Sequence, residues 1–495
     1  MVYVKAIITF ISYLFQFVVS QTELRFAFTF WRHGARVPDV GVSANNVDIL
    51  GNNWDLPEGE LLPSGMRMHY LLGYLNRKRW VTSEEFLSSS YRSNELYVKS
   101  TEFNVTMMSV LSNLQGLYPA GSGPELTLEQ STLAYPPTPE DFYDTIIDDI
   151  NLGDKFNINL KYRPYALPHK IQVIPVHVFA PNGDMFFFTN NAICPSFTRS
   201  LSENAKSETC KKVAADFNSR IGNTLKAALD IKDDNFFLSF LNVYMAADSY
   251  ISGNIFGQEF KKIKDFFKLE VDLNNFLEEF ILAAEDFHIN YVFDYFNGNY
   301  MVSRIMMTPF YNDAIRWMET RISYDRENKG YTGYAAPKLV IYSTHDMNLG
   351  AAHLTLKDAF ELTSKPLIST KFASNFIFEL RRPKNKDISL LTEKDYTVDI
   401  LYNHELYHSV TYTTFKENLE KKIILSSEDL SQFCELNHSE TIERDSIPES
   451  YVNATIILSL LVFITLIFII VLVKKLIKKH KTDSNSNLDN IIHVV

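Results

Sequence analysis

The pattern of apolar positions near the start of the chain predicts two strands, each followed by a helix. Residues 24–31 (LRFAFTFW) are β-prone, and residues 64–80 have helical spacing. The apolar stripe of that helix consists of Met68, Leu71, Leu72 and Leu75. Residues 95–100 predict the second strand. We expect residues 101–116 to form the second helix, which ends at a glycine and has Thr101 as its N-cap.

The pattern changes in the middle of the chain and then returns to strands. Residues 196–330 are aromatic-rich and mostly helical in period, after a segment rich in proline and glycine. Residues 337–346 form a nearly continuous apolar run, which is typical of a strand buried on both faces of a parallel or mixed sheet. A helix follows it. Residues 373–380 and 396–402 predict two more strands.

These elements predict an α/β fold in which a mixed central sheet is flanked by helices and carries an inserted helical domain. The body of the protein covers residues 21–435. Its α/β core is expected at residues 21–118 and 335–435, and its mostly helical cap at residues 119–334.

Both ends of the chain carry apolar segments. Residues 1–20 have a lysine before an apolar run and end in small residues, which indicates a signal peptide; the alternative is a buried first helix. Residues 454–473 contain no charge and are long enough to span a bilayer. The tail, residues 474–495, begins with a lysine cluster that favours the cytosolic side, which includes Lys474, Lys475, Lys478 and Lys479. We therefore expect a type I single-pass membrane protein whose stalk is residues 436–453 and whose body is luminal or extracellular, in the endolysosomal system or at the cell surface.

Composition restricts the partners and the kind of site. The formal net charge of −11 argues against a general nucleic-acid binder, because phosphate-backbone recognition needs a basic surface. Three cysteines are too few for a cysteine-based zinc site, and in an oxidising compartment two can pair. Of the three N-glycosylation sequons, at Asn104, Asn437 and Asn453, we expect only Asn437 to be easily modified.

The stretch FTFWRHGARVPDV places a histidine between two arginines at the end of the first strand. Ligands of α/β sheets lie at the carboxyl ends of strands, so Arg32 and His33 should face a crevice, with Gly34 allowing close approach of the backbone to a ligand. The guanidinium groups of Arg32 and Arg36 disfavour protonation of His33. A neutral imidazole beside two anion-binding groups is suited to attack phosphorus, forming a phosphohistidine.

The dipeptide His345-Asp346 follows the buried run of residues 337–346 and can complete such a site. Asp346 can protonate a leaving alkoxide and later activate water, while a protonated His345 would contact the phosphoryl group. This chemistry requires no metal and no cofactor. Taken alone, a His-Asp dipeptide is more often a turn with a capping aspartate.

At these residues the sequence resembles the histidine acid phosphatase family, whose branch includes lysosomal and prostatic acid phosphatases and phytases. Arg32, His33, Gly34, Arg36 and Pro38 match the R-H-G-x-R-x-P motif, and the His-Asp pair matches the second motif. The resemblance implies an α/β core with a helical cap, a phosphate monoester as substrate, and a homodimer. It also implies that His33 is the nucleophile, that Asp346 donates the proton, and that Arg32, Arg36 and His345 bind phosphate. The family's cysteine pairing implies a Cys194–Cys434 disulfide, which leaves Cys210 free.

One position departs from the family. A third motif, close to R-S-T-D-x-D-R-T-L-M-S, supplies a phosphate-binding arginine where this chain has Val105. Lys99 or Arg92 could replace that charge. We therefore expect an acid phosphatase of reduced activity. The alternative is a catalytically silent membrane receptor or binding module. A phosphoglycerate-mutase-like enzyme fits the secretory ends poorly, and neither the Gly-x-Ser-x-Gly motif of serine hydrolases nor a phosphate loop occurs.

Overall fold

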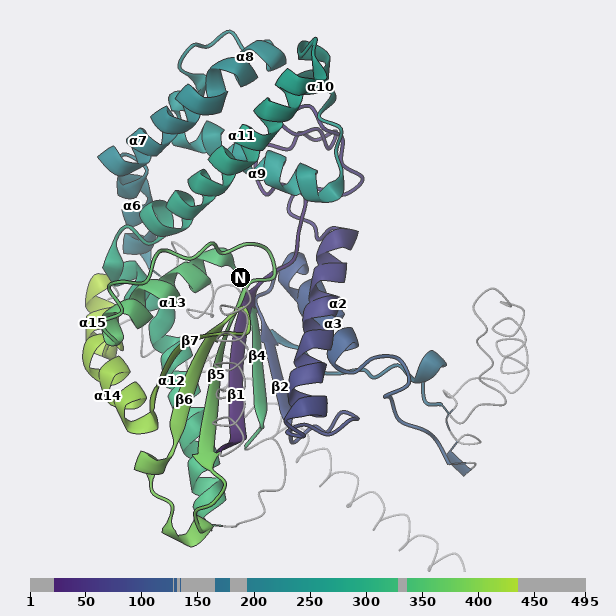
Figure 1. Cartoon of the computed structure of the whole chain (residues 1–495), viewed down its shortest axis with the longest axis vertical. Helices are drawn as coiled ribbons and strands as arrows, with labels where there is room; N and C mark the ends of the chain where they lie inside the picture. The colour runs from purple at the N-terminus through teal and green to yellow at the C-terminus, as the bar shows by residue number, and fades with distance from the viewer. Residues whose placement is uncertain are drawn as a thin grey trace, which may run out of the picture. The chain divides into compact units, whose positions relative to one another are not determined.

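The computed structural model describes residues 22–127, 129–130, 134, 165–178, 194–327 and 336–434 (Figure 1). The chain up to Leu430 forms one compact unit, and a second unit begins at Ser431. The expected signal peptide, the membrane span at residues 454–473 and Asn437 lie outside the described residues. Within the described ranges, no helix is both long enough and apolar enough to cross a bilayer.

A seven-stranded mixed sheet forms the centre of the α/β core, in the order β3-β2-β4-β1-β5-β6-β7. The strands β1 to β4 are mutually parallel, while β5, β6 and β7 run antiparallel to their neighbours. Their bounds are β1 Thr22–Arg32, β2 Leu96–Ser100, β3 His177–Val178, β4 Leu339–Thr344, β5 Asn375–Pro383, β6 Thr397–Tyr402 and β7 Glu405–Thr411. The predicted α/β fold with a mixed sheet is confirmed.

Residues 26–31 of β1 are buried and, apart from Thr29, apolar, because helices cover both faces of the sheet. Trp31 packs in a cluster with residues of α3, whereas the ring of Phe30 lies 5.3 Å from that of Phe310 on α12. Both Trp31 and Phe30 are fully buried. Burying a side chain of this size contributes about 1.5–3 kcal/mol. The central position of β1 therefore explains why its sequence does not alternate between apolar and polar residues.

Helices α2 (Pro63–Arg77) and α3 (Asn104–Leu117) pack against each other on one face of the sheet. The predicted apolar stripe of α2 is wrong: Leu71 and Leu75 are 54% and 45% exposed. The buried face instead contains Gly73, where an added Cβ would lie 1.9 Å from the Asn113 carbonyl oxygen of α3. The two helices approach so closely that small residues, rather than leucines, must occupy their contact.

Helix α12 (Tyr300–Glu327) belongs to the sheet rather than to the cap. Its Asp313 accepts a hydrogen bond of 2.6 Å from the hydroxyl of Tyr342 on β4. The expected cap boundary at residue 334 is therefore too late, because helical period alone does not distinguish a helix that covers a sheet from one that does not. Three further helices follow: α13 Asp346–Ala359, α14 Tyr412–Lys422 and α15 Ser427–Phe433.

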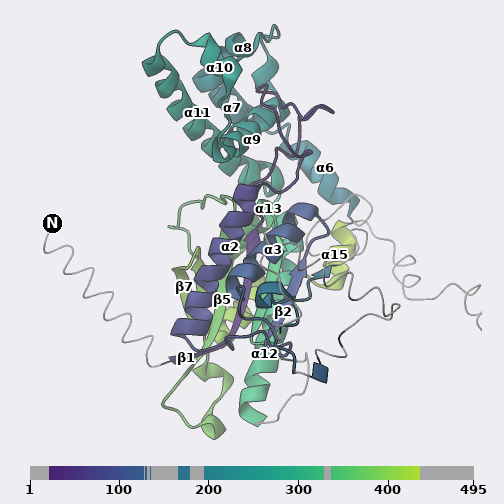
Figure 2. The ribbon, with the colours of Figure 1, turned by 90° about the vertical axis from the view of Figure 1, so that its right-hand side faces the viewer.

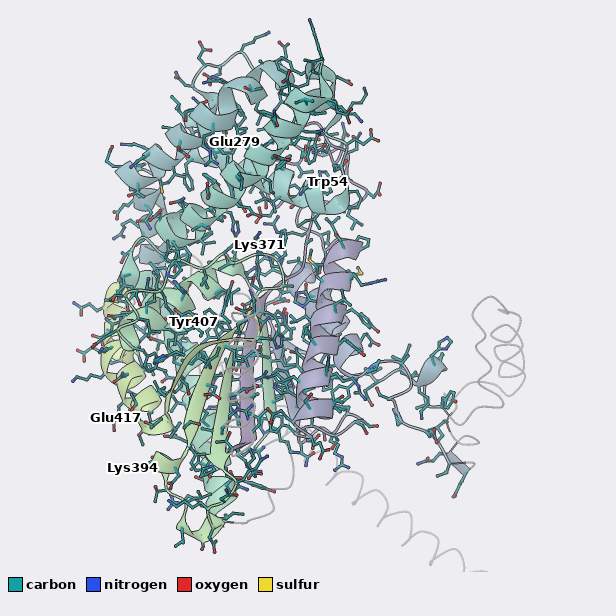
Figure 3. All side chains as sticks on the ribbon, viewed as in Figure 1. Trp54, Glu279, Lys371, Lys394, Tyr407 and Glu417 are labelled. Atoms are coloured by element: carbon teal, nitrogen blue, oxygen red, sulfur yellow. The ribbon has the colours of Figure 1, made fainter. Side chains whose placement is uncertain are left out.

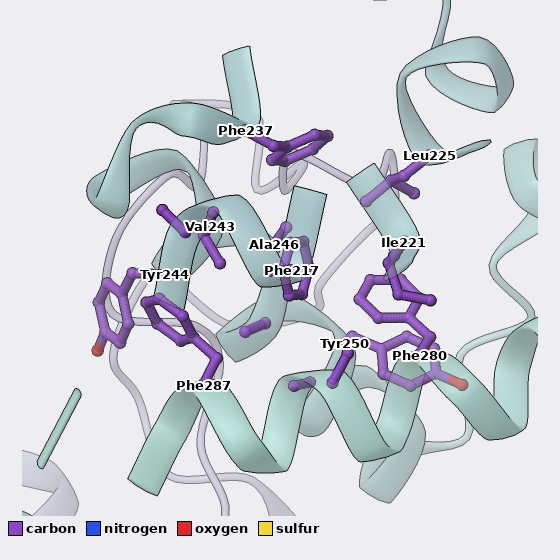
Figure 4. Packing of buried hydrophobic residues seen from close by; sticks show 14 of the residues in the cluster. Phe217, Ile221, Leu225, Phe237, Val243, Tyr244, Ala246, Tyr250, Phe280 and Phe287 are labelled. Atoms are coloured by element: carbon purple, nitrogen blue, oxygen red, sulfur yellow. The ribbon is translucent and has the colours of Figure 1, made fainter. Parts of the chain in front are cut away.

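The cap helices lie beyond one end of the sheet in both views (Figures 1 and 2). They are α6 Pro195–Asn204, α7 Glu208–Phe217, α8 Asn223–Leu229, α9 Phe240–Phe256, α10 Lys261–Phe266 and α11 Glu270–Asn290. Aromatic residues fill the space between them, and Phe217, Tyr250 and Phe280 all belong to one buried cluster (Figure 4). The rings of Tyr250 and Phe280 are stacked with centroids 3.8 Å apart. This packing gives the cap its own apolar core.

The cysteines and the first sequon lie in described parts of the chain. Cys194 and Cys434 are disulfide-bonded, as the family resemblance implied, and Cys210 is a free, buried thiol. Asn104 is exposed at the start of α3, and its side-chain amide donates a hydrogen bond of 2.6 Å to Glu60.

Candidate active site

The candidate nucleophile lies directly after β1. The His33 amide donates to the Thr344 carbonyl at the end of β4 (3.0 Å), and the Ala373 amide donates to the His33 carbonyl (3.1 Å). His33 is thus held between a parallel neighbour of β1 and the segment that leads into its antiparallel neighbour β5. His33 therefore lies at the carboxyl end of β1, and the carboxyl ends of strands are where ligands of open α/β sheets bind.

Gly34 is required by the contact with α2. A Cβ at this position would lie 2.4 Å from the carbonyl oxygen of Gly65, a distance at which backbone must move. The Gly34 amide donates to the hydroxyl of Ser109 on α3 (3.0 Å). The glycine of the RHG motif therefore allows the residues after β1 to pack closely against α2. We had expected it to let a ligand approach the backbone.

The imidazole of His33 is buried and held in one tautomer. Its Nδ1 lies 2.9 Å from the Gly34 carbonyl oxygen, which can only accept, so Nδ1 carries the proton. The lone pair is then on Nε2. Burial, followed by the charges of Arg32 and Arg36, lowers the pKa of His33 well below its ordinary value. The arrangement provides an uncharged imidazole with an available nitrogen.

Arg32 lies between the candidate nucleophile and Asp346. Its Nη2 lies 3.0 Å from Oδ2 of Asp346, and its Nη1 donates to the Thr370 carbonyl (2.9 Å). The guanidinium carbon is 4.1 Å from the centroid of the Phe372 ring, which also lies 5.8 Å from the ring of His33. Its Nε is buried and has no hydrogen-bond partner among the described residues. Arg32 therefore keeps one donor for an anion.

Arg36 is bound by two carboxylates. Its Nη1 donates to Asp248 of α9 (2.8 Å) and its Nη2 lies 3.0 Å from Asp39, which also accepts from the hydroxyl of Tyr244 (2.6 Å). Burial raises the pKa of Asp248 to about 6, although Arg36 opposes the shift. Asp39 belongs to the motif stretch, but nothing in the sequence links Asp248 to it. Arg36 thus joins the α/β core to the cap through ion pairs.

His345 lies beside His33, with ring centroids 5.5 Å apart. Its Nε2 is 3.3 Å from the hydroxyl of Thr101, which is 2.6 Å from that of Thr106. Thr101 is therefore not the N-cap of α3; that position belongs to Phe103. Burial lowers the pKa of His345 to about 4, so its imidazole is mostly uncharged above that pH, in contrast to the protonated form that we expected.

Asp346 begins helix α13 and receives donors from both domains. Besides Arg32, the imidazole of His288 on α11 contacts it, with Nε2 and Oδ2 3.0 Å apart. Burial would raise the pKa of Asp346, but Arg32 and His288 outweigh that effect and hold it well below its ordinary value. His288 was not found from the sequence, because it lies 58 residues from Asp346 without any motif. Asp346 of the core is thus joined to the cap through His288.

The position of the missing arginine lies next to this site. Val105 is in the first turn of α3, adjacent to Thr106, and is 7% exposed. Neither expected substitute replaces the arginine. The Lys99 ammonium lies 5.5 Å from the ring centroid of Tyr342, on the sheet face that α12 covers. Arg92 is exposed and precedes the amino end of β2, whereas the site lies at the carboxyl end of that strand.

The geometry brings together Arg32, His33, Arg36, His345 and Asp346, the residues selected from two motifs more than 300 residues apart. The family model described as "Histidine phosphatase superfamily (branch 2)" matches residues 23–403. The chain belongs to this family. The resemblance seen at the motifs is thereby confirmed, and the sheet with its helical insertions is the α/β architecture that this resemblance implied.

Individual relatives match shorter segments of this histidine phosphatase. Prostatic acid phosphatase of Bos taurus is 39% identical over 101 residues, 20% of this chain and 25% of that protein. The Rattus norvegicus protein of the same name is 28% identical over 222 residues, 45% and 46% of the two chains. The crystal structure of Klebsiella sp ASR1 phytase has a TM-score of 0.47 at 12% identity and covers 82% of this chain and 98% of that chain. The chain spans between a quarter and just under half of the two acid phosphatases.

Proposed function

We propose that the protein is a metal-independent acid phosphatase that hydrolyses phosphate monoesters through a phosphohistidine at His33. The observation that carries the proposal is the tautomer of His33: Nδ1 is bound to the Gly34 carbonyl, so the lone pair of Nε2 is available for attack on phosphorus. The unpaired Nε of Arg32 supports the same function, because a buried guanidinium donor requires an acceptor and a phosphoryl oxygen is a good one.

The residues on this site have complementary roles in such a reaction. Attack by His33 Nε2 forms the nitrogen–phosphorus bond while the bond to the ester oxygen breaks, and Asp346 gives that oxygen its proton. Water then releases phosphate from His33, with the Asp346 carboxylate accepting its proton. Arg32 stabilises charge that develops on the phosphoryl oxygens. Arg36 can do so once its carboxylate partners release it.

The experiment measures phosphate release from a chromogenic ester by the full-length protein between pH 4 and 6. His33→Ala should abolish turnover, and His408→Ala, on edge strand β7, should not. Brief incubation with labelled ester followed by alkaline quench should trap an acid-labile phosphoenzyme in the parent protein only. Equal turnover by the parent protein and His33→Ala would refute the proposal.

Val105 favours a second function, a phosphate-binding module without turnover. Deleting one preorganised donor for developing charge lowers a rate by about a hundredfold to a thousandfold in other enzymes. Calorimetry with inorganic phosphate or vanadate distinguishes the two functions. Tight binding together with no phosphate release would favour the silent module.

We also propose that the protein is a type I membrane protein of the endolysosomal system or the cell surface. The uncharged residues 454–473 and the lysines that follow them support this location. Protease added outside sealed microsomes should remove only the tail, and digestion of the body would refute this orientation.

A further inference from the structure

A cavity of about 330 Å³ opens next to the catalytic groups, between the cap and the core. Arg32 and His288 form part of its lining, and both contact the same oxygen of Asp346. Lys371, on the loop before β5, also lines it and lies between the cap helices and the sheet in Figure 3. Asp346 and His33 do not line the cavity, but Arg32 and His288 separate it from the Asp346 carboxyl group that serves as the acid of the proposed reaction. When the phosphoryl group of an ester faces His33, the alcohol portion can therefore extend past these two residues into the cavity.

The walls of this cavity are largely apolar and come from four separate parts of the chain. They are contributed by α2, α9, α11 and the loop before β5, through Met68, Ile251, Ile255, Ile281 and Phe372. Met68, Ile251 and Ile255 also pack against the buried cluster that contains Phe372. These side chains are therefore held in place before any ligand arrives, which reduces the entropic cost of binding.

The charge of the cavity is nearly balanced within its own walls. Besides Arg32, its only lining cation among the described residues is Lys371, whose ammonium lies 2.6 Å from the Glu285 carboxylate. A further phosphate group on the alcohol would meet isoleucines, the Glu285 carboxylate, the uncharged side chains of Asn254 and Ser369, and a lysine that is already paired with Glu285. Since a buried anion requires paired charge or several donors, polyphosphorylated esters would lose affinity here.

Resting on the proposed function, we propose that the natural substrate is a phosphate monoester of an apolar alcohol, and that Ile251, Ile255 and Ile281 determine this specificity. The volume matches the lower end of small-molecule sites and accommodates an aromatic ring with a short linker. Inositol polyphosphates are poor substrates by the same reasoning.

The test compares 3-phenylpropyl phosphate with propyl phosphate, since both esters release a primary alkanol of similar leaving ability. The full-length protein at pH 5 should show a kcat/KM at least about tenfold higher for the phenylpropyl ester, because even one methylene in an apolar pocket gives about 10- to 200-fold discrimination. Inositol hexakisphosphate should be the slowest of the three. A ratio near one, or faster hydrolysis of inositol hexakisphosphate, would overturn the inference.

Variants and a non-hydrolysable probe keep this inference separate from the proposed function. Ile281→Asn should reduce the phenylpropyl-to-propyl ratio severalfold, whereas Leu282→Asn, at an adjacent position that is 53% exposed, should keep the ratio of the parent protein. If neither ester is hydrolysed, the proposed function fails, and calorimetry with 3-phenylpropylphosphonate and propylphosphonate still tests the cavity. Equal affinity for the two phosphonates would overturn the inference, and at least about tenfold tighter binding of the first would support it.

Discussion

Replacing His288 by alanine tests whether the cap controls the protonation of Asp346, the acid of the proposed reaction. In the structure two donors converge on Oδ2 of Asp346, namely Nη2 of Arg32 and Nε2 of His288, each at 3.0 Å. Both stabilise the ionised carboxylate. His288→Ala removes one donor and leaves Arg32 in place, so the pKa of Asp346 should rise towards its ordinary value.

The magnitude follows from the kind of bond that is lost. A hydrogen bond to a charged group contributes about 1.5–3 kcal/mol. A pKa unit corresponds to about 1.36 kcal/mol, so the pKa of Asp346 should rise by about 1–2 units. In the proposed reaction Asp346 acts as an acid, so activity requires its protonated form. The alkaline limb of the kcat/KM profile should therefore move to higher pH by about the same amount.

The assay records kcat/KM of the full-length protein and of His288→Ala from about pH 2 to 8 with one ester, so that ionisation of the substrate cancels. The range extends to this low pH because the pKa of Asp346 in the parent protein lies well below its ordinary value. His288→Gln, whose side-chain amide can still donate, should give an intermediate shift. His353→Ala removes a buried histidine bonded to Tyr407 rather than to the site and should leave the limb in place. An alkaline limb that stays fixed or moves to lower pH in His288→Ala would refute this account of Asp346.

Three other substitutions have distinct expected outcomes. Asp248→Asn should strengthen phosphate binding at pH 7 by about 10-fold or more, because Arg36 loses a charged partner whose pKa is about 6. The same change should make the phosphate affinity less dependent on pH between 5 and 7. Calorimetry at pH 5 and pH 7 measures both effects, and an unchanged affinity would contradict the prediction. Val105→Arg should raise kcat by as much as about 100-fold if the new guanidinium reaches the phosphoryl group, and a fall in kcat with retained thermal stability would count against that placement. Glu379→Gln should lower the free energy of unfolding at pH 7 by about 3–5 kcal/mol, since it leaves the guanidinium groups of Arg79 and Arg381 without their buried anion. The pKa of Glu379 is about 2 in the folded protein, so its contribution to the free energy of unfolding is present above the unfolded pKa of about 4.3 and is lost as the pH falls towards 2. Urea unfolding at pH 7 and pH 3 should show this loss of stability in the parent protein but not in the variant.

The central strands could be predicted because burial on both faces leaves a continuous apolar run, as in β1 and β4. Edge strands carry no such signal. Strand β7 was missed because half-exposed edge positions admit polar residues such as Glu405, and β3 is only two residues long. Helix α2 was predicted, but not its buried face, because its contact with α3 depends on the absence of side chains at Gly73.

The residues of the candidate site also fall into those that could be predicted from the sequence and those that could not. The motif residues could be selected because their spacing along the chain is short and their chemistry is specific. His288 and Asp248 reach the site from cap helices, and no local pattern indicates where those helices fold. The sequence also suggested Lys99 as a substitute for the missing arginine, but the alternation of side chains along β2 turns it to the sheet face under α12.

The position of β1 has a consequence for the synthesis of this protein. It is the first strand of the sheet, yet its two neighbours, β4 and β5, are encoded more than 300 residues later. While the chain is still emerging from the ribosome, the apolar residues 24–31 have no partner strand, and His33 has neither of the backbone contacts that fix it. A product truncated before residue 339 would lack both neighbours of β1 as well as His345 and Asp346, so we expect it neither to complete the sheet nor to release phosphate.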